Sequence, residues 1–119
     1  MGCPVVHFEI GCPDVDQARA FYSSLFDWKV EGSGSSATIS TGAGISGHIT
    51  ALGHEPHNYV NIYVEVDDIE ACLERAARLG GKTLIGPLDL PDGSGSFAWL
   101  QDPGGTTVGL LTRAKQARE

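Results

Sequence analysis

The chain has little of what marks secreted, disulfide-stapled or nucleic-acid-binding proteins. It contains 3 cysteines, Cys3, Cys12 and Cys72, which form no CxxC pair, and an odd count is poor evidence for a disulfide framework. There are 8 lysines and arginines against 15 acidic residues, for a net charge of -7, and phosphate contacts need clustered cations. We therefore expect no nucleic-acid partner and a reducing, cytoplasmic location.

Long apolar runs are also missing. No run approaches the roughly 18 residues of a membrane span, and the opening Met-Gly-Cys-Pro has neither the basic nor the apolar region of a signal peptide. We expect no membrane insertion and no secretion. A chain of 119 residues is long enough to bury one core as a single domain, residues 1–119. Its 16 glycines indicate many turns.

The most informative pattern is an internal repeat. The segment 7–16 resembles the segment 61–70, so that His7 lies over Asn61, 54 positions later. Both segments alternate as half-buried strands do, with apolar Val6, Phe8 and Ile10 on one face of the first and Val60, Ile62, Val64 and Val66 on one face of the second. The opposite faces carry His7 and Glu9, then Tyr59, Asn61, Tyr63 and Glu65.

An amphipathic helix is predicted after each of these strands. Asp14 with Gln17, and Asp67 with Glu70, are candidate capping boxes. The predicted apolar stripes are Val15, Ala18, Tyr22 and Leu25 in the first helix and Ile69, Cys72, Ala76 and Leu79 in the second. The pair Gly80-Gly81 is a natural end for the second helix.

A glycine-punctuated β region follows each helix, at about 29–51 and 82–112. The two regions end alike, because 45–50 matches 107–112 and places Gly47 over Gly109, 62 positions later. The second copy therefore carries about eight extra residues, which we assign to a long hairpin around Pro87, Pro91 and Gly93.

These elements predict an α+β fold of two tandem βαβββ modules. Their strands would form a curved mixed sheet that lines a cleft, with the helices outside. Module one covers about 4–52, the linker 53–57, module two about 58–112, and a C-terminal tail 113–119. A ferredoxin-like βαββαβ layout uses similar elements, but it expects fewer strands after each helix.

Three segments carry a resemblance to a known family: the helix Ala18–Trp28, the segment Val64–Ile69 and the turn Leu100–Gly105 before the last strand. Together they resemble the vicinal oxygen chelate superfamily, which includes glyoxalases, bleomycin-resistance proteins and extradiol dioxygenases. The resemblance covers nearly the whole chain. It does not single out one activity within the superfamily.

In metal-dependent members, the resemblance implies a divalent metal held by the first and last strands of both modules. His7 matches such a ligand, but Asn61 stands where a histidine is common, and Gly47 and Gly109 offer no side chain. One ligand of four is too few, since such sites generally need three or more protein ligands. We therefore expect no cofactor and disfavour the glyoxalase and dioxygenase reactions. The alternative is a divalent metal ion at His7 in an atypical site.

The candidate catalytic residues are His7 and Glu9, and the candidate ligand-binding residues are Tyr59, Asn61, Tyr63 and Trp99. Two phenols around an amide suit a polar or aromatic small molecule. Glu9 beside His7 could act as acid or base, but we expect Glu9 and Glu65 to be solvated at the open end of the cleft. The sequence leaves open whether Phe97 and Trp99, or Ala98 and Leu100, face the cleft.

Other histidines and glycines receive structural interpretations. His48 follows Gly47, so alternation predicts that it points to the helix side or to an interface. Gly47 and Gly109 are predicted to leave the centre of the cleft roomier. His54 and His57 lie in the linker, where they are solvated or form a surface metal site with each other.

Three functions follow from this sequence. The first is binding of a small organic molecule without a metal, as in resistance, sequestering or sensor proteins. The second is a lyase or isomerase that uses His7 as acid or base, or in an atypical metal site. The third is an interaction module with a vestigial cleft. A homodimer is expected, because modules of this family commonly pair between chains and sheet edges can pair.

Overall fold

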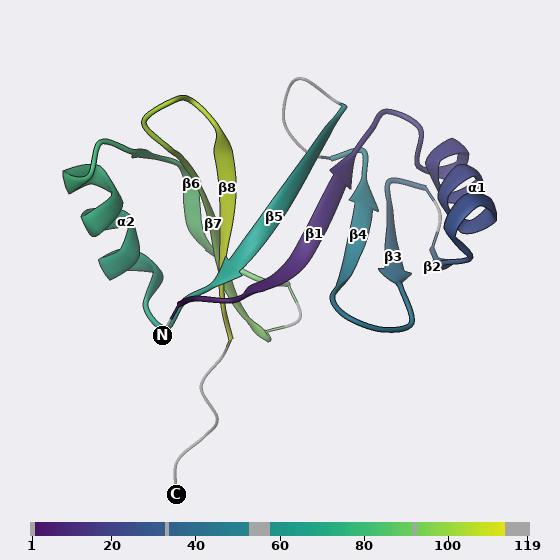
Figure 1. Ribbon diagram of the computed structural model, residues 1–119, viewed down its shortest axis with the longest axis horizontal. Helices are drawn as coiled ribbons and strands as arrows, with labels where there is room; N and C mark the ends of the chain where they lie inside the picture. The colour runs from purple at the N-terminus through teal and green to yellow at the C-terminus, as the bar shows by residue number, and fades with distance from the viewer. Residues whose placement is uncertain (1, 33, 53–57, 92, 114–119) are drawn as a thin grey trace, which may run out of the picture. The chain divides into compact units, whose positions relative to one another are not determined.

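The computed structural model describes residues 2–32, 34–52, 58–91 and 93–113. Within these ranges the chain forms two helices and eight strands, in the order βαβββ followed by βαβββ (Figure 1). The predicted α+β fold of two tandem βαβββ modules is confirmed. The predicted linker, with His54 and His57, and the tail beyond Arg113 lie outside the described residues.

The elements of module one are β1 (Val5–Gly11), α1 (Val15–Phe26), β2 (Lys29–Glu31), β3 (Ser36–Ser40) and β4 (Ser46–Thr50). Those of module two are β5 (Tyr59–Glu65), α2 (Ile69–Arg78), β6 (Lys82–Asp89), β7 (Gly95–Gln101) and β8 (Thr107–Arg113). Neither helix in the described ranges has the length and apolar character needed to cross a bilayer.

The chain divides into two compact units. The first unit is Val6–Ile62, and the second unit is Met1–Val5 with Tyr63–Glu119. The boundary falls inside β5, so the first half of that strand belongs to the first unit. Tyr59 and Asn61 are therefore in the same unit as His7 and Glu9.

Each unit contains a mixed set of strands. In the first unit, β2, β3 and β4 pair antiparallel in sequence order, and β4 then pairs parallel with β1. In the second unit, β6, β7 and β8 pair antiparallel and β8 pairs parallel with β5. Strand β6 has 8 residues where β2 has 3, which accounts for much of the extra length predicted for the second copy.

Aspartates cap both helices. The Asp14 carboxylate accepts a hydrogen bond from the Gln17 amide at 3.0 Å, as the sequence predicts. On α2 the cap is Asp68, which accepts from the Ala71 amide at 3.1 Å, so the predicted Asp67–Glu70 capping box is wrong by one residue. The Asp67 carbonyl instead accepts from the Thr112 hydroxyl at 3.2 Å, which ties this residue to β8.

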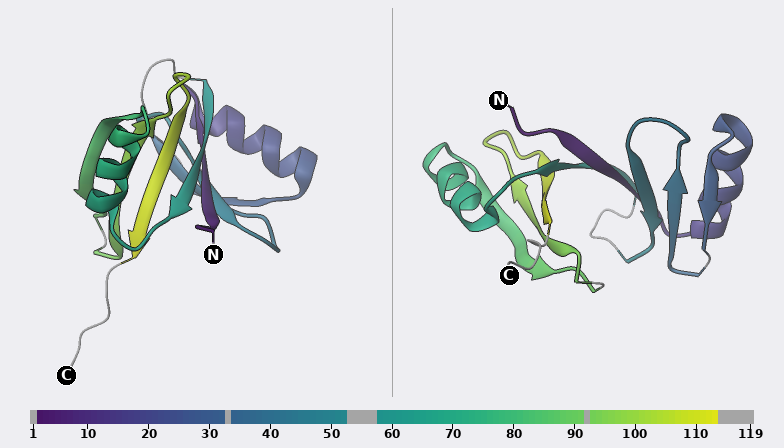
Figure 2. Two further views of the ribbon diagram at one scale, coloured as in Figure 1. Left: turned by 60° about the vertical axis from the view of Figure 1, so that its left-hand side comes forward. Right: turned by 90° about the horizontal axis from the view of Figure 1, so that it is seen from below.

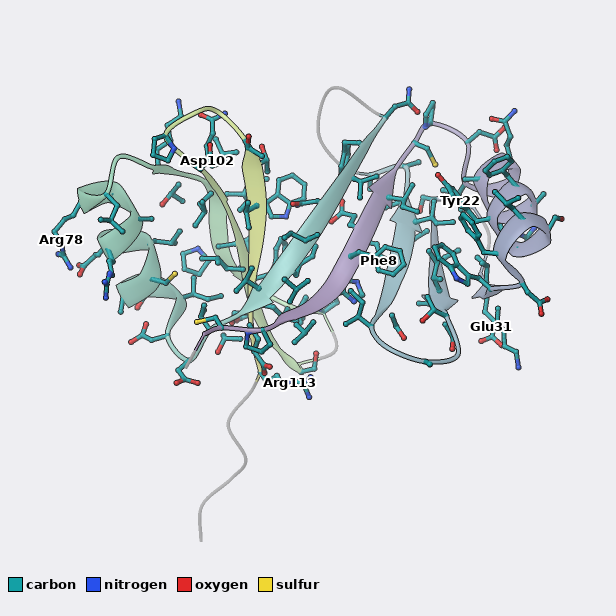
Figure 3. The ribbon with its side chains drawn as sticks, in the orientation of Figure 1. Phe8, Tyr22, Glu31, Arg78, Asp102 and Arg113 are labelled. Carbon is teal, nitrogen blue, oxygen red and sulfur yellow. The ribbon has the colours of Figure 1, made fainter. Side chains whose placement is uncertain are left out.

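The core of the first unit lies between α1 and its strands. The buried residues are Ile10, Val15, Ala37, Ile39 and Ile49, with Phe8, Ala18, Tyr22 and Trp28 packed against them (Figure 3 labels Phe8 and Tyr22). The prediction for Leu25 is wrong, since this residue is 59% exposed. The Trp28 ring fills the space instead, with its centroid 5.8 Å from that of Tyr22 and 5.6 Å from that of Phe8.

The core of the second unit lies between α2 and β6, β7 and β8, as the two further views also show (Figure 2). It contains Val66, Ile69, Ala98 and Leu110, with Val64, Cys72, Leu73 and Leu100 packed against them. The prediction that Leu79 belongs to the buried stripe of α2 is wrong, because this residue is 68% exposed. Leu79 is the C-cap, beyond the last helical residue Arg78, and so has left the buried helix face.

Aromatic rings of neighbouring strands cover the glycines at 47 and 109. A Cβ on Gly47 would lie 2.5 Å from the Phe8 carbonyl oxygen and 2.8 Å from its ring. A Cβ on Gly109 would lie 2.5 Å from the Tyr63 ring. The prediction that these glycines leave empty space is therefore wrong, since the rings occupy it, as in the packing of aromatic residues over sheet glycines.

Gly109→Ala tests this packing. The added Cβ must displace the Tyr63 ring, so we expect the free energy of unfolding to fall by about 1–3 kcal/mol, as in other overpacked sites. Urea denaturation followed by circular dichroism measures it. Gly104→Ala is the matched control, because its Cβ would meet nothing nearer than the Asp102 carboxylate at 3.6 Å. An equal effect of the two substitutions would contradict the proposed contact.

Candidate functional site

Polar side chains from three strands meet on one face of the first unit. On β1, Phe8 and Ile10 belong to the core, so alternation places His7 and Glu9 on the opposite face. The parallel register of β1 and β4 pairs Glu9 with His48. His7, Glu9 and His48 therefore share the face that is turned away from α1, which we call the open face.

Direct contacts join these residues to Tyr59. His7 Nε2 lies 2.7 Å from His48 Nδ1, within hydrogen-bond distance, and their rings stack at 5.0 Å between centroids. His48 Nε2 lies 3.6 Å from Glu9 Oε1. The Tyr59 hydroxyl donates a hydrogen bond to Glu9 Oε2. We call these four residues the imidazole–carboxylate network.

The prediction that His48 points to the helix side is wrong. That prediction assumed that Gly47 faces the cleft, whereas Gly47 pairs with Phe8 and lies on the core side of β4. Alternation then turns His48 to the open face. An aromatic residue on the first strand that pairs with a glycine on the last is the sequence signal that could have revealed this.

The expectation that Glu9 is solvated is also wrong, because this residue is 2% exposed. Removing a carboxylate from water costs several kcal/mol unless hydrogen bonds or opposite charges compensate. Here the Tyr59 hydroxyl and the nearby His48 imidazole supply compensation. The Tyr59 ring lies over Gly11, which has no side chain to obstruct it.

Both imidazoles are biased toward the neutral form. Burial lowers the pKa of His7, the neighbouring His48 lowers it further, and the Glu9 carboxylate opposes both effects. Burial likewise lowers the pKa of His48, against the opposing effect of Glu9. Near neutral pH the two rings can therefore share a hydrogen bond, in which one N–H donates to the lone pair of the other ring.

Asn61 also belongs to the first unit and is 3% exposed. Within the described part of the chain, neither its amide nitrogen nor its amide oxygen has a hydrogen-bond partner. Alternation along β5 places Asn61 on the same face as Tyr59. A buried amide without partners is costly, so a water or a bound molecule would stabilise it.

The remaining predicted residues lie in the second unit. Trp99 is 6% exposed, and its Nε1 donates a hydrogen bond to the Tyr63 hydroxyl at 2.7 Å. Ala98 and Leu100 belong to the core, so Trp99 lies on the opposite face of β7. Glu65 accepts from Arg113 Nε at 2.9 Å (Figure 3 labels Arg113). The Tyr63 and Trp99 contact thus belongs to a different unit from the imidazole–carboxylate network.

The network does not fit a metal ion as it is arranged. Two nitrogens bound to one tetrahedral zinc ion lie about 3.3 Å apart, whereas His7 Nε2 and His48 Nδ1 are at the 2.7 Å separation of a hydrogen bond. Glu9 Oε2 is already bonded to Tyr59. Among the described residues, no group of three or more His, Cys, Asp or Glu is placed to hold a metal.

A pocket of about 830 Å³ opens in the first unit beside Tyr59. Its other lining residues include Ile10 on β1, Tyr22 on α1 and Val60 on β5. This volume lies within the range of small-molecule sites, roughly 300–1,000 Å³. Because Ile10 and Tyr22 belong to the α1-side core, this pocket lies on the α1 side of the strands. His7, Glu9 and His48 do not line it.

Comparisons of sequence identify relatives. The family described as "Glyoxalase/Bleomycin resistance protein/Dioxygenase superfamily" matches residues 5–110. A glyoxylase-like domain-containing protein of Didymella fabae is 28% identical over 88% of this chain and 90% of its own length. An anthracycline biosynthesis protein of Streptomyces peucetius is 30% identical over 87% of this chain, which spans 44% of that protein.

Solved structures share the fold. A hypothetical protein from Bacillus halodurans has a TM-score of 0.72 at 16% identity, with 98% of each chain covered. A methylmalonyl-CoA epimerase from Streptomyces coelicolor, in complex with 2-nitronate-propionyl-CoA, has a TM-score of 0.71 at 18% identity, over 97% of this chain and 100% of that one. At these identities the likeness establishes the fold alone.

The lowered histidine pKa values predict how stability depends on pH. An unfolded histidine titrates near about pH 6.5, so below that pH the unfolded chain binds protons that His7 and His48 resist in the folded state. This part of the stability is present above about pH 6.5 and is lost as the pH falls. We expect the double variant His7→Gln, His48→Gln to lose less stability between about pH 7.5 and 5.5. Urea midpoints at each pH measure this, and equal losses in both proteins would contradict it.

Proposed function

Since the chain belongs to the Glyoxalase/Bleomycin resistance protein/Dioxygenase superfamily, we propose that it binds a small organic molecule, without a metal ion, at the imidazole–carboxylate network of its first unit. The observation that carries the proposal is the buried Glu9 carboxylate, held by Tyr59 and flanked by His48. Burying this carboxylate costs free energy on folding. It also places a negative charge beside His48, which is within hydrogen-bond distance of His7 on the open face.

Further observations support binding. Asn61 has an unsatisfied buried amide that a polar ligand group could satisfy. The names of the relatives and structural neighbours point to small-molecule chemistry as well, through a glyoxylase-like protein, an anthracycline biosynthesis protein and an epimerase. The cytoplasmic location stays a prediction.

A compound screen tests the proposal. Thermal shift and ¹⁵N-histidine NMR would be recorded with enolisable carbonyl compounds, phenols and 2-oxo acids such as acetylacetone, phenol and pyruvate. We expect at least one compound to raise the melting temperature and to move the His7 and His48 signals, and His7→Ala to abolish the response. Glu65→Gln, on the other unit, is the control and should leave it unchanged. Failure of every compound would count against the proposal.

Metal independence is tested in the same samples. We expect no stoichiometric transition metal by elemental analysis of the purified protein, since the described residues provide no suitable set of ligands. Dialysis against EDTA should leave the binding response to the active compound unchanged. A response that disappears with EDTA and returns with Zn²⁺ or Ni²⁺ would support the metal alternative at His7.

Acid–base catalysis is the second candidate function, because His7 and His48 form a connected path to a carboxylate. It would appear as a lyase or isomerase reaction on a carbonyl-containing substrate. Methylmalonyl-CoA, named with one structural neighbour, is a suitable probe. Enzyme-dependent deuterium exchange beside the carbonyl, lost in His7→Ala and retained in Glu65→Gln, would support this function over simple binding.

The homodimer is likewise a proposal. Helix α1 exposes large apolar side chains, with Phe21 at 57%, Leu25 at 59% and Phe26 at 50%, and β5 exposes Val60 at 70%. Contiguous exposed apolar groups favour association. We expect light scattering to give twice the chain mass of 12.5 kDa, and Phe21→Ser with Leu25→Ser to shift the protein toward the monomer. A wild-type monomer at all concentrations would contradict the dimer.

A further inference from the structure

Two cysteines of the second unit flank the loop 66–68, which connects β5 to α2. Cys3 precedes Pro4, whose carbonyl accepts a hydrogen bond from the Glu65 amide at 2.8 Å, at the end of β5 (Figure 1). Cys72 is the fourth residue of α2, directly beyond the loop. Both are free thiols, and both belong to the second unit. The N-terminal segment and the first turn of α2 therefore bring one thiol each to the same loop.

The helix directs the Cys72 side chain back toward this loop. In an α-helix every Cα–Cβ bond is tilted toward the helix N-terminus, so a side chain covers the turn that precedes it. That turn begins at the N-cap Asp68, whose carbonyl accepts from the Cys72 amide at 3.1 Å. Cys72 is half-buried and packs against the core that contains Val66 and Ile69. Its thiol is thus held at the loop, whereas Cys3 is exposed and precedes the first residue of β1.

The two thiols also interact through their charges. Burial raises the pKa of Cys72, the Cys3 thiolate raises it further, and the Arg75 guanidinium opposes both effects. Charges at a protein surface are largely screened beyond about 10 Å, so this effect agrees with the placement of both thiols at one loop. Cys12 provides the contrast. Burial raises its pKa as well, but the group that acts on it besides burial is Asp14 and not a second thiol.

We propose that Cys3 and Cys72 form a reversible disulfide bond that stabilises the fold when the protein is oxidised. The bond closes a loop of the chain that contains the whole first unit, Val6–Ile62, and with it the imidazole–carboxylate network. A cross-link between residues so far apart in sequence restricts the unfolded chain, which favours the folded state. In a reducing compartment the pair stays as two thiols and reports a change in redox conditions. The proposal does not depend on the proposed function, because it requires no ligand at the network.

The bond forms by exchange with a low-molecular-weight disulfide, which is the oxidant. The exposed Cys3 thiolate attacks one sulfur of this disulfide, the S–S bond breaks, and one half leaves as a thiolate. The Cys72 thiolate then attacks the Cys3 sulfur of the mixed disulfide and expels the other half. The two protein thiols together lose two protons and two electrons. The oxidant gains them and is released as two thiols.

Acidic side chains around the loop favour one class of oxidant. One pocket beside it is lined by four carboxylates and one guanidinium, those of Glu65, Asp67, Asp68, Glu70 and Arg113. The net charge of the chain is -7. This field repels an anionic reagent such as oxidised glutathione and attracts a cationic one. Cystamine, a small disulfide with two ammonium groups, is therefore the probe that suits this site.

Mass spectrometry of the full-length protein tests the pairing. Reduced protein is treated with cystamine, the remaining thiols are blocked with iodoacetamide, and the protein is digested without reductant. We expect one peptide pair linked through Cys3 and Cys72 within a single chain, Cys12 alkylated, and the bond reversed by dithiothreitol. Cysteamine attached to Cys3 without closure would overturn the proposal. So would a Cys3 link between two chains, or pairing with Cys12.

Melting temperatures test the consequence of the bond. We expect the oxidised protein to melt about 5–15 °C above the reduced protein. Cys3→Ser, which changes an exposed side chain, should abolish the difference. Cys12→Ser is the matched control, because Cys12 is also a half-buried thiol but belongs to the first unit, and it should keep the full difference. Oxidised wild type that melts at or below the temperature of the reduced protein would overturn the proposal.

Discussion

The contact between the Phe8 ring and Gly47 decides which side chains of β1 and β4 meet. The ring occupies the position where a side chain on Gly47 would stand, so the parallel pair holds with Phe8 opposite Gly47 and Glu9 opposite His48. A shift of one residue would turn every side chain of a strand to the other face. The imidazole–carboxylate network therefore depends on a residue that carries no side chain.

A second ring over a glycine brings Tyr59 into the same network. The Tyr59 ring lies over Gly11 at the end of β1, and its hydroxyl reaches Glu9 two residues earlier along the strand. Together with His48, this hydroxyl compensates part of the cost of burying the carboxylate. Packing and polar contacts are thus coupled. The Phe8 ring over Gly47 and the Tyr59 ring over Gly11 also position the side chains of the network.

Sequence patterning predicted the modules but not the faces of every strand. Phe8 and Ile10 of the first strand and Val64 and Val66 of the second lie in the cores as predicted, and Asp14 caps its helix as predicted. Val60 and Ile62, predicted on the same face, are 70% and 41% exposed. Another error arose at the last strands, where Gly47 and Gly109 were assumed to be equivalent. Gly47 pairs with Phe8 on the core side, whereas Gly109 pairs with Tyr63 on the opposite face. Pairing of distant strands is not visible in local alternation, so alternation alone predicted neither the face of His48 nor the burial of Glu9.

The same asymmetry explains why the two modules differ chemically. In the first unit the covering ring points to the core, and the next residue of β4, His48, turns to the open face. In the second unit the ring of Tyr63 lies over Gly109 on the face away from the core, where it binds Trp99. Aromatic packing therefore takes the place that polar side chains occupy in the first unit. Among the described residues, the close pair of histidines therefore belongs to the first unit alone.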